Sequence, residues 1–151
     1  SVPATPANAT TRSKQHGVEV MLSARPIPQL RLDAAYTYTD SNQNGVAEVR
    51  RPHHIASFNA TVQSRDERFS TTLTVRYNGR QTDLAYTDPS YVPVRVSLAE
   101  YALVNLSAQV RLTPAVTLFA RAENLTGEEY EELFAFASAG RAGYAGVRVA
   151  F

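Results

Sequence analysis

Arg141-Ala-Gly-Tyr-Ala-Gly-Val-Arg-Val-Ala-Phe151, the last stretch of the sequence, alternates apolar and polar residues and ends on an aromatic side chain. Successive side chains of a β-strand point to opposite faces. One face is therefore predicted to be apolar, and it carries Ala145, Val147, Val149 and Phe151. The opposite face carries Tyr144 and Arg148. One apolar face, one wet face and a terminal aromatic residue are typical of the final strand of an outer-membrane β-barrel.

The composition at first suggests an ordinary soluble protein, with 44% hydrophobic and 19% charged residues among 151. In a transmembrane barrel every second residue faces water or protein, so the mean hydropathy is low and only the alternation reveals the membrane face. The sequence contains no run of about 18 apolar residues, so no membrane-spanning helix is predicted. The net charge is +1 with scattered basic residues, which argues against a nucleic-acid partner. Cysteine is absent, which excludes disulfides and thiolate metal sites.

Alternation in six earlier segments, together with the last one, predicts about seven long strands. The six segments are residues 17–25, 30–39, 56–63, 69–78, 102–111 and 116–123. Short turns at Pro26, Ser64 and Thr113 alternate with long connections that start at Asp40, Arg80 and Thr126. Antiparallel neighbours place every second connection on the same side, and outer-membrane barrels keep the periplasmic side short. The predicted fold is all-β, an antiparallel up-and-down meander that forms the C-terminal portion of a transmembrane β-barrel.

Charged residues are sorted between the two predicted faces. The apolar faces of these segments carry none, whereas the opposite faces carry Glu19, Arg31, Asp33, Arg76, Arg111, Arg121, Glu123 and Arg148. Because a charged side chain at the bilayer midplane costs roughly 2–4 kcal/mol, lipid explains this sorting. The core of a soluble β-sandwich would also exclude charge, but soluble strands usually have about 5–6 residues and these are about twice as long.

Aromatic residues lie where a membrane interface is expected, and three other residues do not fit the pattern. Tyr38 and Tyr77 fall at the outer ends of the apolar faces, as in an aromatic girdle, and Phe69 falls at an inner end. Three apolar side chains share the polar phase instead: Met21, Leu103 and Phe119. They predict either a local shift of phase or packing against something inside the barrel, such as a plug.

An odd number of strands cannot close a bacterial single-chain barrel. Open strand edges in lipid leave unpaired backbone groups, so we expect pairing with upstream strands. The sequence starts at Ser1 without the features of a signal peptide, and we interpret it as a fragment. Residues 1–12 lack periodicity and are expected to be an extracellular loop remnant, and residues 13–151 are expected to be the C-terminal strands.

Two motifs resemble metal-binding sequences, but neither is interpreted as a metal site. Asp40-Ser-Asn-Gln-Asn-Gly45 matches the first half of a calcium loop, yet Arg51 stands where a bidentate Glu is needed, with Glu48 only a partial substitute. A polar hairpin with an Asn-Gly turn is the favoured interpretation. His53 and His54 are strand neighbours that point to opposite faces, and His16 is distant in the sequence. We therefore predict no metal site.

Enzyme activity is not predicted, because no nucleophile motif or glycine-rich phosphate loop is present. No catalytic residue or cofactor is assigned. If the protein is a receptor, its ligand should be contacted by the long connections. There Tyr86, Asp88 and Tyr91 combine aromatic area with a polar group. Simple loop packing is the alternative for each of them.

Several stretches resemble TonB-dependent outer-membrane receptors, over nearly the whole chain. They are the closing strand with Gly140-Arg141, Arg121-Ala-Glu-Asn-Leu-Thr-Gly-Glu-Glu-Tyr130, Arg50-Arg-Pro-His-His-Ile-Ala-Ser-Phe58 and Lys14-Gln-His-Gly-Val-Glu-Val20. The spacing is similar to that of vitamin B12 and siderophore receptors. The resemblance implies import of a siderophore-iron complex or a corrinoid across the outer membrane of a Gram-negative bacterium.

The same resemblance implies a set of partners. They are upstream barrel strands, a plug domain, outer-membrane lipid, the barrel-assembly machinery and the TonB energy-coupling protein, which would engage a region upstream of this chain. The assembly machinery is expected to recognise the terminal pattern at Ala145, Val147, Val149 and Phe151. Two rival functions remain: a passive porin or outer-membrane enzyme, and a soluble all-β binding module.

Overall fold

The computed structural model describes residues 11–151, and residues 1–10, which hold most of the expected loop remnant, lie outside that range. All regular structure between residues 11 and 151 is β-strand. In this described part, no helix long and apolar enough to cross a membrane is present.

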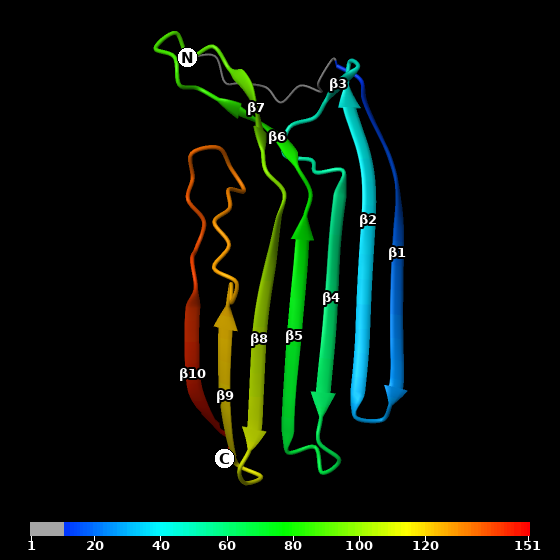
Figure 1. The fold of residues 1–151 in the computed structure, drawn as a ribbon, viewed down its shortest axis with the longest axis vertical. Helices are drawn as coiled ribbons and strands as arrows, with labels where there is room; N and C mark the ends of the chain where they lie inside the picture. The colour runs from blue at the N-terminus through cyan, green and yellow to red at the C-terminus, as the bar shows by residue number, and fades with distance from the viewer. Residues whose placement is uncertain (1–10) are drawn as a thin grey trace, which may run out of the picture.

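Seven long strands form one antiparallel sheet in the order β1-β2-β4-β5-β8-β9-β10 (Figure 1). Their bounds are β1 Ser13–Ile27, β2 Leu30–Gln43, β4 His54–Gln63, β5 Phe69–Asn78, β8 Tyr101–Arg111, β9 Val116–Glu123 and β10 Ala142–Val149. The short β3 (Val46–Ala47) pairs with β2, while β6 (Gln81–Ala85) and β7 (Val94–Leu98) form a separate hairpin. Each long strand therefore pairs with its neighbours in chain order, as an up-and-down meander requires.

The connections separate by length, as predicted from the sequence. Short turns join β1 to β2, β4 to β5 and β8 to β9 at the lower edge of Figure 1, where the carboxyl terminus also lies. The long connections all lie at the opposite edge. We call this the outer end, and the edge with short turns the inner end.

The pairing register places apolar side chains opposite one another across the whole sheet. Val18 pairs with Tyr38, and Leu73 pairs with Ala60 on one side and Leu106 on the other. Further pairs at the two ends of the sheet continue this apolar face: Leu22 with Ala34, Leu30 with Val62, Phe69 with Val110, and Val147 with Leu118. A shift of one residue in any strand would break the pattern, because it moves every side chain to the other face.

The apolar face is uncovered within residues 11–151. Leu22 is 69% exposed and Val147 and Val149 are each 59% exposed, although all three belong to this face. The face is therefore not packed against a second sheet in the described part of the chain, as the soluble sandwich would require.

Two strands extend three or more residues further at their outer ends than the sequence predicted. β1 begins at Ser13 instead of residue 17, and β2 continues to Gln43 instead of ending near Asp40. Their added outer ends are polar, and His16 lies opposite Asp40, with 3.6 Å between His16 Nε2 and an Asp40 carboxylate oxygen. The apolar alternation stops at Tyr38 while the backbone pairing continues, which explains why the pattern of apolar residues missed this part.

The connection from residue 79 to residue 100 is also not a simple loop. It contains the β6–β7 hairpin, which pairs Gln81 with Leu98 and Ala85 with Val94. Figure 1 shows this hairpin extending from the outer ends of β5 and β8.

Candidate functional site

The outer-loop layer is formed by the three long connections, residues 44–53, 79–100 and 124–141. It is the best-buried part of the described chain. The buried side chains lie in these connections or at the outer ends of the adjoining strands: Ser41, Asp83, Ala85, Leu98, Tyr101, Leu103 and Asn124. The layer therefore has a defined internal structure.

The predicted ligand-contact residues lie at the tip of the β6–β7 hairpin. Tyr86 is 55% exposed and Tyr91 is 74% exposed, so a large part of each side chain is accessible at the tip. Asp88 organises the tip, because its carboxylate accepts a 2.7 Å hydrogen bond from the Ser90 amide and its carbonyl accepts one from the Tyr91 amide at 2.9 Å. The Ser90 hydroxyl and amide hold the pKa of Asp88 below its ordinary value. The tip presents two exposed aromatic rings beside one anionic group.

Asp83 is the most deeply buried charged group in the described residues, with 1% of its surface exposed. Its Oδ1 accepts a 2.7 Å hydrogen bond from Arg50 Nε, and its Oδ2 accepts one from the Phe134 amide at 2.8 Å. Burial raises the pKa of Asp83, but the bonds from Phe134, Arg50 and the Leu84 amide outweigh it and keep the pKa below the ordinary value. Asp83 is therefore a buried anion satisfied by partners from two other connections.

Asn124 shapes the β9–β10 connection. Its side-chain amide donates to the carbonyls of Glu128 at 2.9 Å and Ala139 at 3.3 Å, and its Oδ1 accepts the Glu128 amide at 2.8 Å. Its backbone has a φ of 50°, a left-handed conformation that asparagine adopts more readily than most residues. One buried side chain thus joins the start and the end of this connection.

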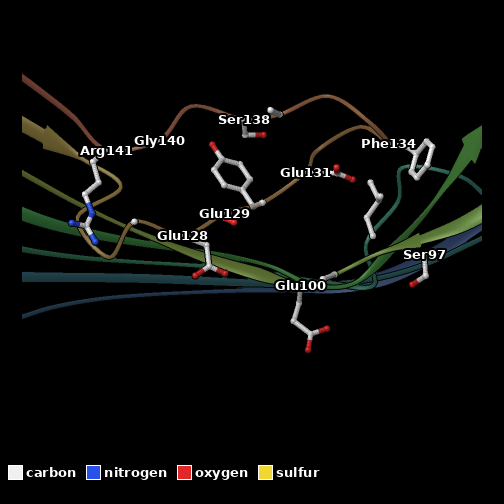
Figure 2. A pocket seen from close by; sticks show the side chains of 14 residues that line it. Ser97, Glu100, Glu128, Glu129, Glu131, Phe134, Ser138, Gly140 and Arg141 are labelled. Carbon is white, nitrogen blue, oxygen red and sulfur yellow. The ribbon is translucent and has the colours of Figure 1, made fainter.

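A pocket of about 830 Å³ lies between the β9–β10 connection and the junction of β7 and β8. Figure 2 shows Arg141 at one end of the pocket and Phe134 and Ser97 at the other. Four carboxylates line it, from Glu100, Glu128, Glu129 and Glu131. They do not converge on one point, since Glu100 points away from the connection (Figure 2). Tyr86, Asp88 and Tyr91 are not among the lining residues.

The two motifs that suggested metal binding have other roles in the structure. Asn44 and Gly45 have φ of 54° and 80° between the paired residues Gln43 and Val46, which confirms the Asn-Gly hairpin turn. The Glu48 carboxylate accepts hydrogen bonds from Ser13, Ser41 and Arg51, and these bonds lower its pKa.

The two neighbouring histidines make separate contacts. His53 Nδ1 lies 3.0 Å from the Thr39 carbonyl, and His54 Nδ1 lies 2.8 Å from the Tyr36 hydroxyl. Among residues 11–151, no group of three or more His, Cys, Asp or Glu side chains is arranged to hold a metal ion.

The polar face of the sheet carries ion pairs along the strands. Arg31 donates from Nε at 2.8 Å to Asp33, which also accepts the Ser23 hydroxyl at 2.7 Å. Arg121 lies 3.1 Å from Glu123 at the other side of the sheet. Charged residues predicted to face the inside of a barrel thus pair with one another on that face.

Phe119 lies on the polar face without a local shift of phase, because the pairing register of β9 with β10 is continuous around it. Phe119 pairs with Gly146 of β10, and its ring covers this glycine so closely that an added Cβ would lie 2.6 Å from the ring. The Arg148 guanidinium also lies over the Phe119 ring, 5.9 Å from its centroid. Gly146, a glycine at a polar-face position of the last strand, was the feature of the sequence that could have indicated this packing.

Leu103 and Met21 also keep the polar phase, opposite Arg76 and Ala35. Leu103 is 9% exposed and lies two residues after Tyr101, whose ring packs at a tilt of 35° against Tyr130 of the β9–β10 connection, with 4.4 Å between centroids. Met21 stays 71% exposed.

The family model described as "TonB dependent receptor-like, beta-barrel" matches residues 1–125. The chain belongs to the TonB-dependent receptor family. Members of this family are β-barrels of the Gram-negative outer membrane. For a barrel of this family, we expect the apolar face of the meander to be the lipid face and the polar face to be the inner wall.

Sequence similarity to an individual transporter supports the same family assignment. The chain is 29% identical over 153 aligned residues to the vitamin B12 transporter BtuB of Vibrio cholerae, an alignment that covers 95% of this chain and 24% of BtuB. This chain therefore spans about a quarter of the length of the curated relatives it matches.

Solved receptors share the fold at low sequence identity. The ferripyoverdine receptor of Pseudomonas aeruginosa aligns with a TM-score of 0.78 and 19% identity, over 98% of this chain and 21% of that one. The ferric-catecholate import receptor Fiu of E. coli K12 aligns with a TM-score of 0.76 and 15% identity, over 93% of this chain and 21% of Fiu.

Proposed function

We propose that this chain is the C-terminal wall and outer-loop segment of a receptor that imports a corrinoid such as vitamin B12, or a siderophore-iron complex, across the outer membrane. The observation that carries the proposal is the alignment of 95% of the chain with a vitamin B12 transporter. The similar fold of siderophore receptors supports the second ligand class. No observation favours a passive porin, an outer-membrane enzyme or a soluble binding module.

Transport by this receptor is proposed to need parts upstream of the chain. These are the remaining barrel strands, which pair with the edges at β1 and β10, a plug domain, and the region that engages the TonB energy-coupling protein. The full-length receptor should restore growth of a transporter-deficient strain on limiting corrinoid or on limiting siderophore-bound iron. A protonophore should abolish this growth-supporting uptake. Uptake that persists without the proton-motive force would favour a passive pore instead.

The ligand is proposed to contact Tyr86, Asp88 and Tyr91 at the hairpin tip. A large ligand gains affinity by covering the two exposed rings, because burial of aromatic surface is favourable. Replacing both tyrosines by serine should weaken binding of the transported ligand at least about tenfold, equivalent to roughly 1.4 kcal/mol. The matched control is Tyr77→Ser, on the lipid face of β5, measured on folded purified receptor. Equal affinity in both variants would exclude the hairpin tip from the binding site.

The terminal pattern at Ala145, Val147, Val149 and Phe151 is proposed to be read by the barrel-assembly machinery. Val147 and Val149 lie on the exposed apolar face of β10, opposite Leu118 and Val116, which supports a role in recognition along this edge. Deletion of Phe151 should lower the amount of folded receptor in the outer membrane. Phe136→Ala, a change of another exposed phenylalanine in the β9–β10 connection, is the control. Unchanged abundance after loss of Phe151 would contradict the assembly role.

A further inference from the structure

We propose that Asp83 is a positioning residue that fastens the three outer connections to one another, so that they keep or lose their hydrogen-bonded structure as one unit. The inference does not depend on which ligand is bound, nor on the proposed transport function. It begins from the contrast between Asp83 and its surroundings, since most charged side chains in the described residues are exposed and Asp83 is 1% exposed.

Each carboxylate oxygen of Asp83 is committed to a different connection. Oδ1 binds Arg50, 33 residues earlier, and Oδ2 binds the Phe134 amide, 51 residues later. Asp83 itself belongs to β6, so a single side chain links residues 44–53, 79–100 and 124–141. A neutral side chain could not accept from both partners equally well, because only a carboxylate offers two acceptor oxygens and a charge that matches the guanidinium.

Neighbouring contacts follow the same three-way arrangement. The Arg50 amide donates to the Thr82 carbonyl at 2.7 Å, and Gln81 Nε2 donates to the Glu132 carbonyl at 3.0 Å. Tyr101, at the outer end of β8, donates from its hydroxyl to the Glu132 carboxylate at 3.1 Å. Asp83 therefore lies between two sets of cross-connection bonds, and its removal would leave Arg50 and Phe134 with donors that lack their acceptor.

Asp88 offers a natural contrast within the same hairpin. It is also an aspartate that accepts a backbone hydrogen bond at 2.7 Å, but its partners are Ser90 and Tyr91, only two and three residues away. Asp88 organises the tip locally. Asp83 joins distant segments, so the two residues predict different effects when their charge is removed.

The test is amide hydrogen exchange in the full-length receptor carrying Asp83→Asn, with Asp88→Asn as the matched control. The asparagine keeps the shape but turns one acceptor into a donor that faces Arg50 or the Phe134 amide. We expect exchange of the amides of residues 48–51 and 132–136 to accelerate together, about 10- to 100-fold, because an unpaired buried group raises the free energy of the hydrogen-bonded state. Asp88→Asn should accelerate exchange only at the tip, at the Ser90 and Tyr91 amides.

Arg50→Gln provides a second route if Asp83→Asn does not accumulate, because Arg50 is more than half exposed and its loss leaves no cavity. If the connections form one unit, this change at residue 50 also accelerates exchange of the Phe134 amide, because Arg50 and Phe134 are joined through the Asp83 carboxylate. The double variant should then match the more severe single variant. Acceleration confined to residues 81–85 in Asp83→Asn, or an unchanged Phe134 amide in Arg50→Gln, would overturn the proposal.

Discussion

The strand wall, which is the sheet of seven long strands, and the outer-loop layer differ in which side chains they bury. The wall leaves its apolar face open, with Leu22 at 69% and Val18 at 60% exposure, although the backbones of neighbouring strands are paired. The outer-loop layer buries polar groups instead, and Ser41, Asp83 and Asn124 are each 4% exposed or less. The wall thus depends on its surroundings for burial, whereas the outer-loop layer is held by hydrogen bonds between its own connections.

The two regions therefore place different demands on the sequence. Any apolar side chain on the outer face of the wall is favourable in contact with lipid, so the wall needs only the correct alternation and register. A connection exposed to water gains little from an isolated apolar residue, and a defined shape there requires specific acceptors for specific donors. Changes in the wall should therefore act through membrane burial, and the effects of changes in the outer-loop layer should stay within that layer.

The largest effect is expected from a charge on the lipid face. Leu73→Arg places a cation in the middle of β5, between Ala60 and Leu106, and should destabilise the receptor in lipid by roughly 2–4 kcal/mol. The unfolding free energy in lipid vesicles measures this change. Thr72→Arg, on the inner wall one residue away, is the control and should cost far less. Equal losses for the two variants would remove the distinction between a lipid face and an inner wall.

Loss of one buried amide in the outer-loop layer should have a smaller and confined effect. Asn124→Ala removes three hydrogen bonds and leaves their partners unpaired, at a cost of about 1–3 kcal/mol to the local closed state. Hydrogen exchange of the Glu128 amide should accelerate, while exchange in the paired strands stays unchanged. Asn78→Ala serves as the control, because within residues 11–151 the Asn78 side chain bonds only the adjacent Gly79 carbonyl. Faster exchange throughout β8 and β9 would show that the two regions are not independent.

The wall could be predicted from the sequence more completely than the outer-loop layer. Two segments, Phe69–Asn78 and Val116–Glu123, have the predicted bounds, because period-two alternation marks a strand wherever one face is apolar. The outer ends of β1 and β2 were missed, since His16, Asp40 and Asn42 continue the pairing without any apolar partner. Backbone hydrogen bonds, which carry no sequence signature, define those ends.

The outer-loop layer shows a different limit. Asp83 and Asp88 are both loop aspartates in the sequence, and residue type pointed to Asp88 because it stands between two tyrosines. Burial separates them in the structure, and the burial of Asp83 depends on Arg50 and Phe134, which are remote in the sequence. Such long-range polar pairing has no periodic signal.

The smallest effect is expected where the wall uses an aromatic ring to cover a glycine. Gly146→Ala would place a Cβ 2.6 Å from the Phe119 ring, and partial rotation of that ring should limit the cost to about 1 kcal/mol. Gly143→Ala in the same strand meets nothing within 4 Å and should be neutral or slightly favourable. Combining Gly146→Ala with Phe119→Leu should recover part of the loss, which a double-mutant cycle of unfolding free energies measures. A full loss that persists without the ring would mean that the backbone of β10, rather than Phe119, rejects the extra methyl group, and the inner wall would then be as tightly specified as the outer-loop layer.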